Sequence, residues 1–241
     1  MSFYQVLSRF YDDIFPKNPV QIEFLNRFTF NRNKILDIAA GSGNQALELA
    51  MAGHQVTAID LDEVMIKTIK QKASARKLQL DAYALDMKNI ETLDKSFDMI
   101  MCIGNSIVHL DSIDDISLTL KKIYHLLSKN GALIVQTVNY DRILQHNITE
   151  LPVIHHAEKG ITFVRTYEHA QKKIKFHGTL TIDNSFEQQT FQNCVELYPL
   201  TSNELMNAMG IAGFSTVELF GNFKGDSYHN DSPALIAVGY K

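Results

Sequence analysis

The sequence predicts an α/β fold in which a doubly wound, mainly parallel sheet carries a small antiparallel β lobe as an insertion. Three observations support this fold class. Strand-sized apolar runs alternate with segments of helical period as far as residue 138. A turn with two glycines joins the first of these strands to the helix that follows it. After residue 160, alternating segments follow one another with no helix between them.

The composition is that of a globular protein with a full core. The chain has 241 residues, of which 45% are hydrophobic, and a formal net charge of −4. This charge gives no basic field that would attract nucleic acid or an anionic membrane, and the longest apolar runs are too short to span a bilayer. Residues 1–10 lack the basic start and continuous apolar core of a signal peptide. We therefore expect a cytoplasmic monomer or homodimer that binds neither nucleic acid nor membrane.

Neither the cysteines nor the paired histidines predict a metal site. Cys102 and Cys194 lie in expected strands, at a spacing unlike that of metal ligands, so we expect two reduced, buried thiols. His155 and His156 are adjacent, but no further ligand set stands at a recognised spacing. We expect no metal.

The first thirty residues predict two short helices. The second, at 20–28, has apolar residues at a helical period: Ile22, Phe24, Leu25 and Phe28. The first is either a lid or a packed N-terminal helix, and the sequence slightly favours packing.

A strand, a glycine turn and a helix come next. Lys34–Ile38 is a short apolar run typical of a buried strand, and Gly41 and Gly43 follow it. The next helix stops at Gly53, and a second strand ends on Asp60. Glycines let a ligand approach the backbone, and the helix start directs free N–H groups at it. A carboxylate such as Asp60 can accept both hydroxyls of a ribose.

The same alternation continues to residue 138. The sequence predicts a helix capped by Asp62, strands at 78–85 and 97–103, a helix at 112–127 with a capping-box-like start and an Asn130-Gly131 end, and a strand at 132–138. Successive β–α units imply parallel strands joined by right-handed crossovers.

The remaining chain adds the lobe and two returning strands. Strands are expected at 161–169, 173–182 and 190–198, with a turn at Asp183-Asn184, and they should be antiparallel. A capping box at Thr201 and Glu204 starts another helix, and strands follow at 214–220 and 234–240. We expect one domain over 1–241, with its core at 1–147 and 200–241 and the lobe at 148–199.

The glycine turn by itself permits two cofactors. Gly41-x-Gly43-x-x-Ala46, with Asp60 nineteen positions after Gly41, fits the dinucleotide fingerprint, so an NAD-dependent oxidoreductase is one alternative. Two features disfavour NAD. Asp37 stands where dinucleotide-binding proteins usually place an apolar residue, and the glycine turn is one residue longer than in the direct strand-to-glycine connection.

A wider pattern resembles the class I S-adenosylmethionine-dependent methyltransferases. It is carried by Leu36–Gly43, Ile59–Leu61 and Asp86-Met87. The resemblance implies a Rossmann-like methyltransferase sheet, S-adenosyl-L-methionine as cofactor, Asp60 on its ribose and Asp86 on its adenine. Ala39 departs from the family, which often has Gly there; a methyl group is tolerated if φ is negative. The implied cofactor-binding residues are Tyr11, Asp37, Ala39, Gly41, Gly43, Asp60, Leu61, Asp86, Met87, Ile103 and Gly104. A non-catalytic binder of the same cofactor is the second alternative.

Two segments resemble glycine N-methyltransferase and its small-molecule relatives. These are Cys102–Leu110 and Val138–Leu144. The resemblance implies that Asn105 and His109 face the active site as catalytic residues. If a helical turn forms there, the two side chains share one face, and His109 acts as the base. Both also have structural interpretations: His109 as a helix-packing residue and Asn105 as a turn residue.

The expected function is methyl transfer to a small-molecule acceptor, with an amine nitrogen implied by the resemblance. The predicted substrate contacts are Asn105, Tyr140, Arg165 and Tyr198. Glycine N-methyltransferase has a carboxylate-binding arginine where this chain has Val138, so we expect glycine to be a poor acceptor. Arg142 or Arg165 could replace that arginine, although both also fit a surface position.

Overall fold

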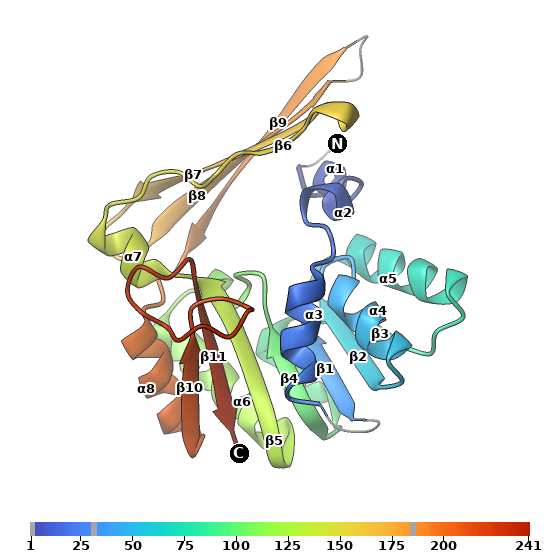
Figure 1. Cartoon of the computed structure of the whole chain (residues 1–241), viewed down its shortest axis with the longest axis vertical. Helices are drawn as coiled ribbons and strands as arrows, with labels where there is room; N and C mark the ends of the chain where they lie inside the picture. The colour runs from blue at the N-terminus through green and yellow to red at the C-terminus, as the bar shows by residue number, and fades with distance from the viewer. Residues whose placement is uncertain (1–2, 30–32, 184–186) are drawn as a thin grey trace.

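A computed structural model of the chain, described here for residues 3–29, 33–183 and 187–241, contains two sheets (Figure 1). The larger sheet holds β1 (Lys34–Ile38), β2 (Gln55–Asp60), β3 (Asp81–Ala84), β4 (Phe97–Cys102), β5 (Leu127–Val138), β10 (Thr216–Phe220) and β11 (Ala234–Tyr240). The smaller sheet, the lobe, holds β6 (Ile154–His156), β7 (Ile161–His169), β8 (Ile174–Asp183) and β9 (Gln188–Leu197). The helices are α1 (Phe3–Leu7), α2 (Tyr11–Ile14), α3 (Pro19–Asn26), α4 (Asn44–Met51), α5 (Glu63–Ala75), α6 (Ile113–Leu126), α7 (Tyr140–Gln145) and α8 (Ser202–Ala212), with 3₁₀ turns η1 (Met87–Leu93), η2 (Ile107–His109) and η3 (Ala157–Lys159).

The larger sheet confirms the predicted fold class. Its order is β10-β11-β5-β4-β1-β2-β3; β3, β2, β1, β4 and β5 are parallel, and β11 and β10 run antiparallel to β5 and β11 respectively. One apolar cluster packs α3, α4 and α5 on one face, and a second packs η1, α6 and α8 on the other. The chain reverses its direction of winding between β1 and β4. In open α/β sheets, ligands bind beyond the carboxyl ends of the strands at such a point.

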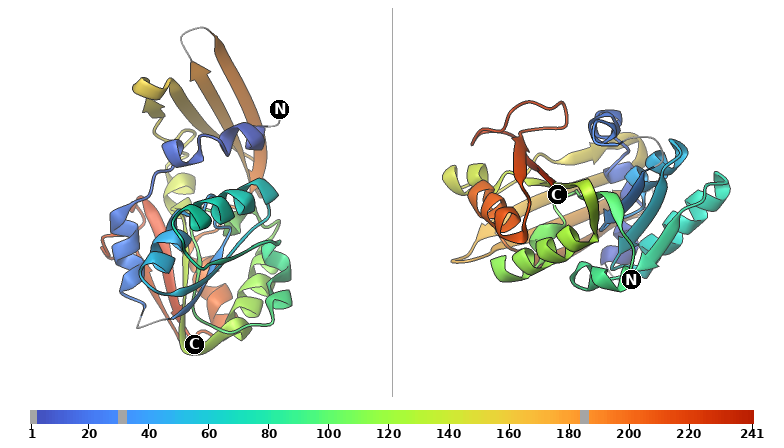
Figure 2. Two further views of the ribbon diagram at one scale, coloured as in Figure 1. Left: turned by 90° about the vertical axis from the view of Figure 1, so that its right-hand side faces the viewer. Right: turned by 90° about the horizontal axis from the view of Figure 1, so that it is seen from below.

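The lobe is antiparallel, as predicted, and rises above the carboxyl edge of the larger sheet (Figures 1 and 2). Its inner face has two apolar contacts. Near the junction with the core, Tyr167, Ile174 and Leu197 belong to the same cluster as α6 and α8. At the far end, Phe163 and Leu180 pack against the N-terminal helices. The lobe is therefore attached to two different parts of the chain.

The N-terminal segment forms three helices rather than the expected two. A turn at 8–10 separates α1 from α2, and α3 begins at Pro19 with Asn18 as its cap. Val6, Leu7 and Ile14 pack into the cluster at the far end of the lobe. The helices α1 and α2 therefore pack on the lobe and not on the parallel sheet.

Three further expectations were wrong. The strand β5 starts at Leu127 and not at 132, because Leu127, directly after α6, is already extended (φ −70°, ψ 136°). Asn130 is left-handed (φ 65°) and lies within β5, where the register with β4 shifts, so Asn130-Gly131 does not end the helix. The strand β3 is shorter than 78–85, and Cys194 is exposed, not buried. Asn184 of the predicted turn lies outside the described residues.

Candidate active site

The glycine turn after β1 lies beside the end of β2. The Gly41 N–H donates to Asp60 Oδ2 at 2.8 Å, and the Asp62 N–H donates to Asp60 Oδ1 at 2.9 Å. Burial raises the pKa of Asp60, and these two hydrogen bonds oppose the shift. An ionised carboxylate has about four lone-pair sites, so Asp60 can accept further hydrogen bonds from hydroxyl groups.

The turn is strained at the position where the family often has glycine. Ala39 has φ 57°, in the left-handed region, like Gly41 (φ 55°) and Gly43 (φ 82°). The expectation that Ala39 has negative φ is therefore wrong. A Cβ in this region meets the following carbonyl, at a cost of roughly 1–2 kcal/mol.

Asp37 is a buried carboxyl group beside this turn. It is 1% exposed, and its Oδ2 has no hydrogen-bond partner among the residues that the structure describes. Burial and the neighbouring Asp60 raise the pKa of Asp37 to about 8, although the Ala46 N–H opposes the shift. A buried acceptor without a partner, next to a glycine turn and a second carboxylate, fits a ligand that carries both cationic and hydroxyl groups.

Tyr11 covers the glycine turn. Its hydroxyl lies 2.8 Å from the point where a Cβ on Gly41 would stand, so the turn needs glycine for this approach as well. Burial, followed by the charges of Asp60 and Asp37, raises the pKa of Tyr11 to about 12. On the same helix, Asp12 accepts from Ser42 Oγ and pairs with Lys72. The helix α2 is therefore held over the turn by polar contacts.

The end of β3 supplies the other predicted cofactor residues. Asp86 caps η1 by accepting the Lys88 N–H at 2.8 Å, and Met87 packs on the core at the first position of η1. Leu61 is 73% exposed and offers apolar surface next to Asp60. Asp60 and Leu61 thus lie at the end of β2, and Asp86 and Met87 follow β3, its neighbour in the sheet.

Asn105 connects the turn after β4 to the end of β5. Its Oδ1 accepts the Val138 N–H at 3.1 Å, and its Nδ2 donates to the Tyr140 hydroxyl at 3.1 Å. The preceding Gly104 N–H donates to Gln136 Oε1 at 2.7 Å, and Ile103 before it is only 6% exposed. Asn105 is left-handed (φ 66°) and precedes the 3₁₀ turn η2. The predicted helical face shared with His109 therefore does not form.

His109 ends η2 and is solvent-exposed. Within the described part of the chain, its ring has no hydrogen-bond partner. The surrounding protein desolvates the ring and lowers the pKa of His109 below its usual value. The backbone beside it is fixed, because the Tyr198 N–H donates to the Val108 carbonyl at 2.8 Å. The imidazole is therefore neutral and accessible at neutral pH.

Three predicted substrate contacts make structural hydrogen bonds within the protein. Tyr140 is fully buried, and burial raises its pKa, so it does not line an open site. The Tyr198 hydroxyl donates to Glu204 Oε1 at 2.6 Å, in the capping box of α8. Arg165 Nη2 donates to the Pro152 carbonyl at 2.7 Å and holds the segment that leads into the lobe. Each of these partners is distant in sequence or specific to the fold, so a pattern of residue types does not reveal it.

Sequence reasoning missed two contributors. Gln136 is a half-buried polar residue that follows the apolar run 132–135 of β5, and its side chain binds the turn after β4. A polar residue directly after an apolar run was a usable signal. Asp12, which connects α2 to the glycine turn, carried no such signal because acidic residues are common on exposed helices.

The described residues include neither a membrane-spanning helix nor a cluster of metal ligands. No helix in the described ranges is long and apolar enough to cross a membrane. Among the same residues, no group of three or more His, Cys, Asp or Glu side chains is placed to hold a metal ion.

Comparison with known proteins finds related methyltransferases. Residues 35–131 match the family described as "Methyltransferase domain". The chain is 26% identical over 207 residues to a glycine/sarcosine N-methyltransferase of Aphanothece halophytica, covering 83% of this chain and 72% of the relative. It is 36% identical over 124 residues to the glycine N-methyltransferase of Rattus norvegicus, covering 46% of this chain and 42% of the relative.

Solved structures share the fold. An S-adenosylmethionine-dependent methyltransferase from Clostridium acetobutylicum has a TM-score of 0.83 at 15% identity and covers 98% of both chains. CalS10, an amino pentose methyltransferase from Micromonospora echinaspora solved with bound S-adenosylmethionine, has a TM-score of 0.70 at 14% identity, over 100% of this chain and 97% of its own.

The fold, the acidic strand ends around the glycine turn and the family match define a class I S-adenosylmethionine-dependent methyltransferase. Within that class, the chain is related to enzymes named glycine and sarcosine N-methyltransferases. Its cofactor is S-adenosylmethionine, and the alternatives of an NAD-dependent oxidoreductase and of a non-catalytic binder are set aside.

Proposed function

We propose that the protein transfers the methyl group of S-adenosylmethionine to an amine nitrogen of a small molecule. The observation that carries this proposal is His109. It is an accessible, neutral imidazole without a partner in the described part of the chain, and it follows β4, the neighbour of β1 in the sheet. The names of the relatives, which are N-methyltransferases, support the choice of nitrogen.

In this proposal the cofactor lies along the ends of β1, β2 and β3. Asp60 accepts the ribose hydroxyls, and Asp86 accepts from the adenine amino group. Asp37, the glycine turn and Tyr11 surround the methionine end, where the buried Oδ2 of Asp37 would gain a partner. The bound sulfonium supplies an electrophilic methyl group. The contacts of α2 with Ser42 and Lys72 keep water from this end of the site.

His109 manages the proton of the acceptor. An amine attacks only in its neutral form, so one proton must leave before or during transfer. A neutral imidazole can accept that proton. Asn105 acts on His109 indirectly, because its two hydrogen bonds fix the turn that precedes η2. Asn105 is thus a positioning residue in this proposal.

The test is turnover with paired acceptors. Purified enzyme is given S-adenosylmethionine and a library in which each amine has a matched alcohol of the same skeleton. S-adenosylhomocysteine is quantified, and the methylated product is located by mass spectrometry. We expect N-methylated products from at least one amine and none from its alcohol. Methylation of oxygen or carbon alone would overturn the proposal.

A further inference from the structure

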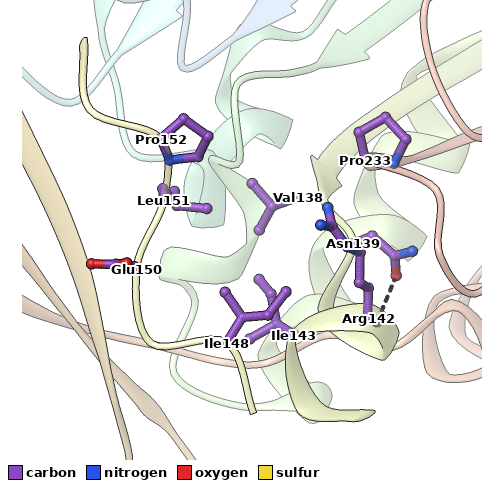
Figure 3. A pocket seen from close by; sticks show the side chains of 9 residues that line it. All are labelled: Val138, Asn139, Arg142, Ile143, Ile148, Glu150, Leu151, Pro152 and Pro233. Atoms are coloured by element: carbon purple, nitrogen blue, oxygen red, sulfur yellow. Dashed lines mark hydrogen bonds between the residues drawn. The ribbon is translucent and has the colours of Figure 1, made fainter. Parts of the chain in front are cut away.

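A small cavity lies at the carboxyl end of β5, between α7, the segment 148–152 and the loop 229–233 (Figure 3). Its volume is about 110 Å³. Most of its wall is aliphatic, from Val138, Ile143, Ile148, Leu151 and two prolines. Such a wall fits an alkyl group, because burial of apolar surface is favourable.

One cation, the exposed residue Arg142, borders these aliphatic surroundings. The Arg142 backbone N–H donates to Asn139 Oδ1, which places the residue in the first turn of α7. Figure 3 shows the Arg142 side chain running from α7 toward Val138. Among the described residues, its guanidinium has neither a hydrogen-bond nor an ion-pair partner. Glu150 also borders the cavity, but its carboxylate is directed away from the other labelled side chains.

The wall of the cavity is held from outside. Arg165 fixes the segment 148–152 twice, because its carbonyl accepts the Leu151 N–H at 2.9 Å and its guanidinium donates to Pro152. On the opposite side, Asn139 Nδ2 donates to the carbonyls of Asn230 and Ser232, at 2.8 and 2.9 Å. A preformed cavity loses little entropy when a ligand enters.

The cavity also adjoins the proposed reaction site. Val138 lines it, and the Val138 N–H is bound by Asn105, in the turn that leads to His109. A group of the acceptor that extends past the end of β5 would therefore reach Arg142.

We propose that this cavity binds a carboxylate of the methyl acceptor and that Arg142 is the residue that recognises it. The proposal rests on the proposed function. A guanidinium presents paired N–H donors that match a carboxylate, and the aliphatic wall fits a short alkyl chain. The acceptor is then an amine whose carboxylate stands several bonds from the nitrogen. Glycine, with a single carbon between its amine and its carboxylate, does not reach from the proposed reaction site to Arg142.

The kinetic test compares 5-aminopentanoate with its amide, 5-aminopentanamide, and with glycine. We expect wild-type enzyme to favour the acid over the amide by about 10- to 100-fold in kcat/KM and to use glycine poorly. Arg142→Met should bring the acid-to-amide ratio close to one, and Arg142→Lys should restore part of it. Arg76→Met, which removes an exposed arginine at the end of α5, is the matched control and should leave the ratio unchanged.

A binding test separates failure of this proposal from failure of the proposed function. Pentanoate has no amine, so its calorimetric binding to enzyme saturated with S-adenosylhomocysteine does not depend on methyl transfer. We expect binding that Arg142→Met abolishes and that Ile148→Phe, which fills the cavity, also abolishes. Pentanoate binding with this pattern but no amine turnover would leave the cavity assignment and refute the amine acceptor. Turnover of 5-aminopentanoate with an unchanged ratio in Arg142→Met, or no pentanoate binding by the wild type, would overturn the assignment.

Discussion

The proposed cofactor and acceptor sites lie on neighbouring parts of the same sheet edge, and these parts use polar side chains differently. At the ends of β1 and β2, Asp37 and Asp60 keep unused acceptor capacity next to a glycine turn. At the ends of β4 and β5, Asn105 and Tyr140 hydrogen-bond to each other, whereas His109 and Arg142 have no side-chain partner among the described residues. The proposed cofactor site therefore keeps hydrogen-bond acceptors for one fixed ligand, S-adenosylmethionine. At the proposed acceptor site, hydrogen bonds fix the backbone and few functional groups are exposed. Specificity there depends on the residues that line the site.

The largest expected effect is a loss of kcat on substitution of His109. His109→Gln keeps hydrogen bonding but cannot take the proton, so kcat should fall by about 100-fold or more with cofactor affinity unchanged. His125→Gln, at the exposed end of α6, is the control. The pH profile adds a second measurement. Activity needs neutral His109, and desolvation lowers its pKa, so the acid limb should lie below the usual histidine value of about 6.5. Full turnover by His109→Gln would remove the base from the mechanism.

The next effect tests whether a single carboxylate contributes strongly to cofactor affinity. Asp60→Ala should weaken S-adenosylmethionine binding by about 1.5–3 kcal/mol, since two hydrogen bonds to a charged group are lost. Calorimetry with purified protein measures it, and circular dichroism confirms that the variant is folded. Asp81→Ala, which removes an exposed acid at the start of β3, is the matched control. Equal affinity of the Asp60 variant and wild type would contradict the assignment of the ribose site.

Asn105→Ala should mainly lower the stability of the protein, whereas His109→Gln should mainly lower kcat. The variant loses hydrogen bonds to Val138 and Tyr140 and places alanine at φ 66°. We expect a loss of about 1–3 kcal/mol in the free energy of unfolding, measured by urea denaturation. Asn105→Gly removes the same hydrogen bonds without the conformational strain, so it should be the milder of the two. A stable Asn105→Ala enzyme with abolished kcat would instead give Asn105 a direct catalytic role.

The smallest effect concerns strain on the cofactor side. Ala39→Gly relieves a left-handed alanine but adds freedom to the unfolded chain, so the two terms nearly cancel. We expect a gain of up to about 1 kcal/mol in unfolding free energy. Destabilisation by this substitution would mean that the Ala39 methyl group makes packing contacts worth more than the strain.

The same contrast explains what the sequence could predict. The glycine turn and its position beside Asp60 could be predicted because the residues follow one another closely: strand, two glycines, helix, then Asp60 at the end of the next strand. The sheet and the antiparallel lobe followed from periodicity in the same way. The roles of Tyr140, Arg165 and Tyr198 were not accessible, because each depends on a partner brought near by the fold. The start of β5 was missed because the left-handed Asn130 belongs to an irregularity within the strand and not to a helix end.

The attachment of the N-terminal helices has a kinetic consequence. The helix α2 carries Tyr11 over the cofactor turn, yet its apolar side chains pack on the lobe, and its contacts with the core are polar pairs such as Asp12 with Lys72. Partly exposed ion pairs break more readily than apolar packing. The helix α2, which lies over the glycine turn, and the lobe should therefore move together when the site opens. Release of S-adenosylhomocysteine and release of the methylated product would then depend on the same opening step. Lys72→Ala removes the ion pair with Asp12 and should speed both.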